Sequence, residues 1–147
     1  MAQMINVRGK CHCGAISIEA AIDETLMVAC HCTDCQQFSG APFRPVVIAN
    51  GADVRLEWQP REYAKTADSG NTRLQGFCGD CGTQLYAADP EKTTYNIRTG
   101  WLDQRDNLVP KIHIFGNSSP DWLTGITDHN WLSHGPGSDA YNPDEAG

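Results

Sequence analysis

The chain has 147 residues, of which 40% are hydrophobic and 20% are charged, as in a single globular domain. Lys and Arg total 11 against 18 Asp and Glu, and the formal net charge of −7 argues against a nucleic-acid partner. The longest aliphatic run, residues 46–49, is far shorter than the ~20 apolar residues of a membrane span. Since MAQMINVRGK at the start also lacks an apolar leader, we expect a cytosolic protein with no membrane partner.

Short alternating segments run through the first two thirds of the chain. Apolar and polar residues alternate over 16–20 and 54–58, and this period of two predicts half-buried strands. The Asn50-Gly51 pair, which lies between two predicted strands, predicts a β-hairpin. Further strands are predicted at residues 26–30, 44–49, 62–66, 73–77, 84–88, 95–99 and 111–115. The sequence therefore predicts a mainly β fold of antiparallel strands.

Helical signals are few, and the C-terminal end is polar. Short helices are predicted after Cys35 and at residues 119–124. From Ser133 onward the chain is rich in Gly and Pro and has few apolar residues to bury, which predicts a domain at 1–132 and a disordered acidic tail at 133–147. No Lys or Arg follows Lys111, so we interpret this end as solvated rather than as a binding element.

Seven cysteines fall into three groups, 11-CHCG-14, 30-CHCTDC-35 and 78-CGDCG-82. An odd number of cysteines in a reducing cell interior indicates metal or thiol chemistry rather than a disulfide framework. In a C-x-C on extended chain both side chains face the same side, so both sulfurs can bind one ion. A C-x-x-C brings its thiolates together in a tight turn, for which Gly79 and Gly82 permit positive φ angles. Both patterns are typical of zinc sites.

The spacing predicts how the cysteines are shared between two ions. Two pairs complete one structural four-cysteine site, formed by Cys11, Cys13, Cys78 and Cys81, which would staple the sheets together. The remaining Cys30, Cys32 and Cys35 provide three ligands and leave a position open, as in catalytic zinc sites. Two alternatives stay open: a single site made of Cys32, Cys35, Cys78 and Cys81, or a histidine that closes the second site.

Other side chains near these groups have simpler interpretations. In a strand, the ring of His31 would point away from the metal, which predicts a surface residue or an outer neighbour of the ligands. His113 would face either solvent or a site. Asp34 is expected to be a solvated turn residue. Three tryptophans are interpreted as core or packing residues rather than as a ligand platform: Trp101, Trp122 and Trp131.

Residues 5 to 125 resemble the glutathione-dependent formaldehyde-activating family, also called S-(hydroxymethyl)glutathione synthases, to which the centromere protein V domain is similar. The resemblance is carried by 9-GKCHCGAISIEA-20, 30-CHCTDCQQFSGAPF-43, 77-FCGDCGTQLY-86 and 110-PKIHI-114, followed by Trp122. It implies an antiparallel β-tent fold with short helical turns and two zinc ions per chain. The structural zinc is implied on Cys11, Cys13, Cys78 and Cys81, and the catalytic zinc on Cys30, Cys32 and Cys35. The implied reaction is that of a carbon–sulfur lyase, with glutathione and formaldehyde as partners.

One departure from the family pattern bears on the substrate. The residues after the third catalytic cysteine are commonly basic in the family, and here they are Gln36-Gln37-Phe38. A cation there would suit the carboxylates of glutathione. Four other basic residues are candidates to replace it, although each alone is interpreted as a surface charge: Arg44, Lys65, Arg73 and Arg98. A lyase acting on another small thiol conjugate and a non-catalytic zinc-binding interaction module therefore remain as alternatives.

Overall fold

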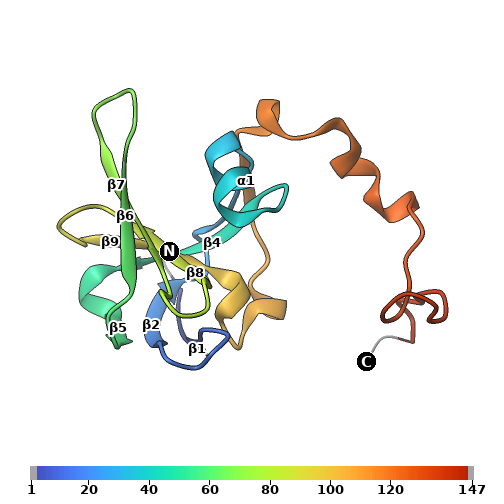
Figure 1. The fold of residues 1–147 in the computed structure, drawn as a ribbon, viewed down its shortest axis with the longest axis horizontal. Helices are drawn as coiled ribbons and strands as arrows, with labels where there is room; N and C mark the ends of the chain where they lie inside the picture. Colours follow the sequence, from blue (N-terminus) through green and yellow to red (C-terminus); the bar gives the residue numbers. More distant parts are fainter. Residues whose placement is uncertain (1–2, 146–147) are drawn as a thin grey trace.

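The computed structural model describes residues 3–145 and contains two sheets (Figure 1). The three-stranded sheet has the order β1 (Met4–Lys10), β2 (Ser17–Asp23), β5 (Val54–Glu57). The seven-stranded sheet has the order β10 (Ile112–Ile114), β3 (Met27–Cys30), β4 (Arg44–Asn50), β9 (Thr94–Arg98), β8 (Gln84–Ala88), β7 (Thr72–Phe77), β6 (Arg61–Thr66). The pairing of β10 with β3 is parallel, and the other strand pairings are antiparallel. The mainly antiparallel β fold is confirmed.

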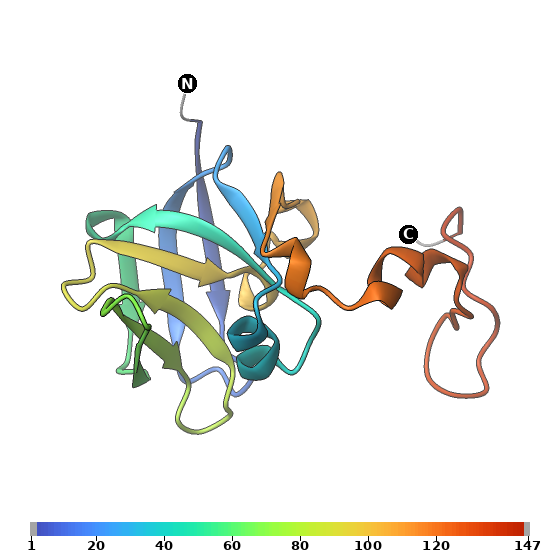
Figure 2. The ribbon, with the colours of Figure 1, turned by 90° about the horizontal axis from the view of Figure 1, so that it is seen from above.

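Helical segments are short. The α-helix α1 (Thr33–Ser39) lies next to β4 (Figure 2). It begins at Cys32, whose sulfur accepts a hydrogen bond from the backbone N–H of Cys35, and it ends at Gly40, whose φ of 68° few other residues adopt. The 3-10 helices are η1 (Gly51–Asp53), η2 (Thr99–Trp101), η3 (Arg105–Asn107), η4 (Gly116–Ser118) and η5 (Asp121–Asp128).

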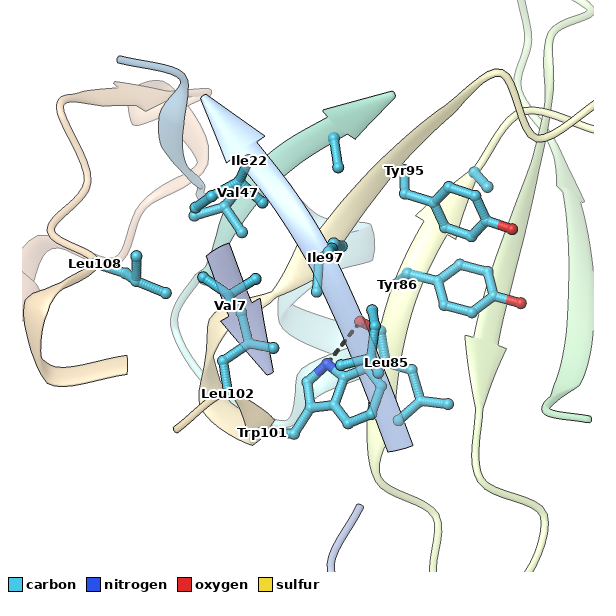
Figure 3. Packing of buried hydrophobic residues seen from close by; sticks show 14 of the residues in the cluster. Val7, Ile22, Val47, Leu85, Tyr86, Tyr95, Ile97, Trp101, Leu102 and Leu108 are labelled. Carbon is cyan, nitrogen blue, oxygen red and sulfur yellow. Dashed lines mark hydrogen bonds between the residues drawn. The ribbon is translucent and has the colours of Figure 1, made fainter. Parts of the chain in front are cut away.

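The hydrophobic core lies between the two sheets (Figure 3). Alternation along each strand sends one set of side chains into it, such as Val47 of β4 and Ile97 of β9, while their neighbours face the opposite side. Trp101 is buried here, as predicted, and its indole N–H donates to the carbonyl of Leu85 at 3.0 Å. One face of the seven-stranded sheet therefore packs in the core, and the other face points away from it.

The predicted hairpin at Asn50-Gly51 is wrong. β4 is an interior strand with β3 and β9 on its two sides, so it has no free edge for β5, which pairs with β2 in the other sheet. The chain crosses between the sheets through η1 instead. Glycine is needed at position 51 because a Cβ there would lie 1.9 Å from the carbonyl oxygen of Lys92. The close approach of the Lys92 backbone, rather than a tight hairpin turn, explains why position 51 is a glycine.

The chain after β10 leaves the two sheets as an arm (Figures 1 and 2). Trp122 and Trp131 lie on this arm with 55% and 48% of their surface exposed, so neither is a core residue, while the Trp131 ring packs against Tyr141. The backbone of Leu132, at the end of the predicted domain, bridges to Ala140 in the predicted tail. Residues 146–147 lie outside the described residues, and the tail boundary and its disorder stay predictions. Among residues 3–145, no helix has the length and apolar character needed to cross a membrane.

Candidate metal centres

The first sulfur cluster consists of Cys11, Cys13, Cys78 and Cys81, whose Sγ atoms all lie within 4.8 Å of one another. The Sγ atom of Cys13 is 3.7 Å from that of Cys11 and 3.8 Å from that of Cys78. A tetrahedral zinc ion with Zn–S bonds of about 2.3 Å separates its sulfurs by about 3.8 Å. The four sulfurs therefore already have the spacing of a tetrahedral thiolate site.

Two turns present these sulfurs. Cys11 follows β1, and Gly14 closes the first turn with φ 81° and an N–H bond to the Cys11 carbonyl at 2.9 Å. Cys78 follows β7, and Gly82 closes the second turn with φ 78° and a similar bond at 2.8 Å. Because β1 and β7 belong to different sheets, the cluster links the two sheets.

Two local expectations about these turns need correction. Cys11 and Cys13 lie in a turn rather than in extended chain. Of the two knuckle glycines, only Gly82 has a positive φ. A Cβ at Gly79 would lie 2.6 Å from the Cδ atom of Arg61, an exposed and flexible side chain that would have to move.

Hydrogen-bond donors next to Cys81 and Cys11 favour the thiolate form that zinc binds at these two positions. The Thr83 hydroxyl lies 3.1 Å from Cys81 Sγ. Hydrogen bonds from this hydroxyl and from the Thr83 backbone lower the pKa of Cys81 to about 5. The backbone N–H of Ile16 donates to Cys11 Sγ at 3.2 Å.

The second cluster consists of Cys30, Cys32 and Cys35, with their sulfurs also within 4.8 Å of one another. Cys30 ends β3, Cys32 caps α1 and Cys35 lies in the first turn of that helix, so the strand-to-helix junction itself assembles the group. The N–H of Cys35 donates to Cys32 Sγ at 3.3 Å. Within residues 3–145, no fourth Cys, His, Asp or Glu joins these sulfurs.

The histidines near the second cluster contact each other instead. His31 is buried, and its Nε2 lies 2.9 Å from Nδ1 of His113. The His31 ring also packs against Phe43, with ring centroids 4.9 Å apart. His31 is therefore not a surface residue, and neither histidine closes the three-cysteine group. The structure likewise brings Cys78 and Cys81 to the first cluster and not to the second, as the preferred partition expected.

The three-cysteine group lines a cavity of about 380 Å³ on the face of the seven-stranded sheet that points away from the core. Arg44 and Arg98 line the same cavity, and only 6% and 7% of their surfaces are exposed. Their interpretation as surface charges is wrong. The strand register explains the placement: Cys30 pairs with Arg44, and Val46 pairs with Arg98, so these side chains share one face. A larger hollow of about 1500 Å³ also has Arg44 and Arg98 in its lining, but no cysteine among the described residues lines it.

Gln36, where the family pattern is commonly basic, has a structural role. Its amide Nε2 donates to the carbonyl of His31 at 2.9 Å and to that of Ser118 at 3.0 Å. It thereby ties α1 to the end of β3 and to the chain beyond β10. Asp34 is not simply solvated, since it forms an ion pair with Lys65 of β6 beside the cavity. The positive charge near the three cysteines therefore comes from the sheet and not from α1.

Comparisons with known proteins agree with this architecture. The family model described as "Glutathione-dependent formaldehyde-activating enzyme" matches residues 6–118. A Schizosaccharomyces pombe protein named as an uncharacterized lyase is 28% identical over 119 residues, which span 80% of this chain and 84% of that protein. A crystal structure of a Rhodobacter sphaeroides protein superposes with a TM-score of 0.55 at 19% identity, covering 72% of this chain and 98% of that one, and shows the same fold. The chain therefore belongs to the glutathione-dependent formaldehyde-activating enzyme family.

Proposed function

We propose that this chain is a zinc-dependent carbon–sulfur lyase of the S-(hydroxymethyl)glutathione synthase type, which joins the thiol of glutathione to formaldehyde. In this proposal one zinc is structural on Cys11, Cys13, Cys78 and Cys81, and a second is catalytic on Cys30, Cys32 and Cys35. The observation that carries it is the unequal pair of clusters: the four-sulfur group is complete, and the three-sulfur group lines a cavity. Family membership and the lyase name of the yeast relative support the reaction class.

The chemistry requires one bond to form and one proton to move. The thiol sulfur bonds to the formaldehyde carbon, the carbon–oxygen π bond opens, and the thiol proton ends on that oxygen. A zinc ion bound to three thiolates supplies a Lewis acid at the fourth position, which lowers the pKa of a thiol or polarises an aldehyde oxygen.

The residues of this chain prepare the position where that ion would lie. Cys30, Cys32 and Cys35 present their sulfurs to the cavity from a rigid strand-to-helix junction. Phe38 and Phe115 add apolar side chains to the lining of the cavity. A non-catalytic binding module would not need a cavity at its incomplete metal centre, and this favours the enzyme over that alternative.

The test is the exchange rate of glutathione with formaldehyde, measured by two-dimensional NMR. Zinc-loaded protein, a Cys32→Ala variant and buffer alone are compared, with zinc content and thermal unfolding measured for each protein. We expect a rate above buffer for the wild type, and a rate equal to buffer for a variant that stays folded and keeps one zinc. A wild-type rate equal to buffer with two zinc ions bound would contradict the proposed reaction. Unfolding of the variant would make the second cluster structural.

A further inference from the structure

Two buried cations face the cavity without a carboxylate partner among residues 3–145. Arg44 and Arg98 are each more than nine-tenths buried. In the part of the chain that the structure describes, no carboxylate lies within ion-pair distance of either guanidinium group. Burying a charged group without a counter-charge is costly, so an uncompensated pair of this kind calls for a reason.

The hydrogen bonds of the two guanidinium groups are only partly satisfied. The Oε1 atom of Gln75 accepts from Nη1 of Arg44 at 3.2 Å and from Nη2 of Arg98 at 3.1 Å. The Nε atoms of both arginines are buried and have no partner among residues 3–145. Burial, and next the charge of Arg44, lower the pKa of Arg98 to about 9. One neutral amide oxygen thus holds together two like charges that an anion would satisfy better.

The two arginines and Gln75 lie beside the three sulfurs of Cys30, Cys32 and Cys35. Arg44 is on β4, directly opposite Cys30 on β3, and Arg98 is one strand further along the same face. Since neighbouring strands are about 4.8 Å apart, a ligand only a few bonds long can reach from the sulfurs to the arginines. Phe38, which lines the cavity, lies under the Arg44 guanidinium, with 5.2 Å between Cζ and the ring centre.

The charges near the sulfurs exceed what a metal centre needs. A divalent cation (+2) on three thiolates (−3) has a net charge of −1, which a single arginine balances. Arg98 then remains as excess positive charge as long as no fourth thiolate is bound, and Arg73 of β7 adds another cation to the lining that stays in excess when one is. Lys65 is already paired with Asp34. The arginines therefore do more than neutralise the thiolates, and the excess suits a ligand with a negative group of its own.

We propose that Arg44, Gln75 and Arg98 form a carboxylate-binding site, and that the thiol used by this protein carries a carboxylate a few bonds from its sulfur. The proposal rests on the proposed function for the identity of the ligand as a thiol. The planar guanidinium groups suit the two oxygens of a carboxylate. Arg44 and Arg98 act as binding residues that orient the thiol toward the three-cysteine group.

Binding of two thiols of similar size tests the site without any measurement of catalysis. Isothermal titration of the zinc-loaded protein is done with mercaptopropionate, which has a carboxylate, and with mercaptoethanol, which has none. We expect mercaptopropionate to bind more tightly by about tenfold or more, since hydrogen bonds to charged groups are worth this much. Acetate and inorganic phosphate are titrated as competitors, and we expect acetate to compete better.

Three variants test whether the preference for mercaptopropionate over mercaptoethanol depends on Arg44, Gln75 and Arg98. Arg98→Gln removes one cation, and we expect the preference for mercaptopropionate to fall to about twofold or less. Gln75→Glu places a carboxylate between the arginines, so we expect it to abolish the preference and to raise the melting temperature. This second variant decides the matter if Arg98→Gln does not fold. Arg55→Gln is the matched control, because Arg55 is an exposed arginine on β5, and we expect the preference to be unchanged.

The outcomes separate this site from the proposed function. Equal binding of the two thiols, or a preference that survives in Gln75→Glu, would overturn the carboxylate site, and stronger competition by phosphate would overturn its carboxylate specificity. If the preference depends on Arg98 while glutathione–formaldehyde exchange stays at the buffer rate, the site stands and the proposed reaction fails. If exchange is catalysed equally well by wild type and Gln75→Glu, the reaction stands and the site fails.

Discussion

The two sulfur clusters use the same side chain and differ in number and surroundings. The four-cysteine cluster lies where two turns from different sheets meet, and its sulfurs have the spacing of a closed tetrahedron. The three-cysteine cluster lies within one strand-to-helix junction and lines a cavity. The comparison teaches that the elements a cluster joins bear on the role we propose for it: the cluster that joins two sheets is proposed to carry stability, and the cluster within one junction to bind a ligand.

The largest expected effect is on stability. We expect Cys78→Ala to lower the free energy of unfolding by about 4 kcal/mol or more, because it removes a ligand from the cluster that links the sheets. Cys35→Ala, the matched change in the other cluster, should cost much less. Thermal unfolding with zinc analysis of both variants is the measurement. A greater loss in Cys35→Ala than in Cys78→Ala would reverse the assigned roles.

Partial removal of zinc should distinguish the two clusters by their affinity for the ion. Three thiolates hold an ion less tightly than four, so we expect a mild chelator to take the ion at Cys30, Cys32 and Cys35 first. The product should contain one zinc per chain, keep its circular dichroism spectrum and lose glutathione–formaldehyde exchange. Loss of folded structure in step with the first zinc would contradict this order.

A smaller effect is expected from the hydroxyl group next to Cys81. Thr83→Val removes the donor 3.1 Å from Cys81 Sγ, so the pKa of that thiol should rise and zinc should bind the four-cysteine cluster about tenfold or more less tightly. Competition with a zinc-binding dye measures the change. Thr66→Val, at a hydroxyl in β6 that contacts Thr72 and no cysteine, is the control and should bind zinc like the wild type.

The smallest expected effect concerns the three-cysteine side. Gln36→Met removes the hydrogen bonds to the carbonyls of His31 and Ser118, and we expect a loss of about 1–2 kcal/mol in unfolding free energy. Gln37→Met, at the exposed neighbouring position, should change stability by less than about 0.5 kcal/mol. Hydrogen exchange of the amides in α1 and η4 would show whether the loss of stability is confined to the segments that Gln36 joins. Equal effects of the two substitutions would remove the structural role of Gln36.

Cysteine spacing predicted which sulfurs meet, because C-x-C and C-x-x-C are local patterns whose geometry depends on a few residues. The buried arginines were missed because their burial depends on strand register: Arg44 faces the cavity only since β4 is interior and Cys30 lies opposite it. The interior position of β4 also explains why the hairpin predicted at Asn50-Gly51 is wrong. That prediction used only local sequence, whereas β4 pairs with β3 and β5 pairs with β2. A signal for Arg44 was present in the strand itself, because Arg44 shares one face with Val46 and is followed by the apolar residues 45–49.

Cys32 performs two tasks with one atom, as the cap of α1 and as a member of the three-sulfur group. The start of the helix and the geometry of the metal centre are therefore one structural unit, and neither can shift without the other. Serine is a strong helix cap but a poor soft-metal ligand, so Cys32→Ser separates the tasks where Cys32→Ala removes both. On the proposed assignment, we expect Cys32→Ser to weaken metal binding while the helix cap is kept.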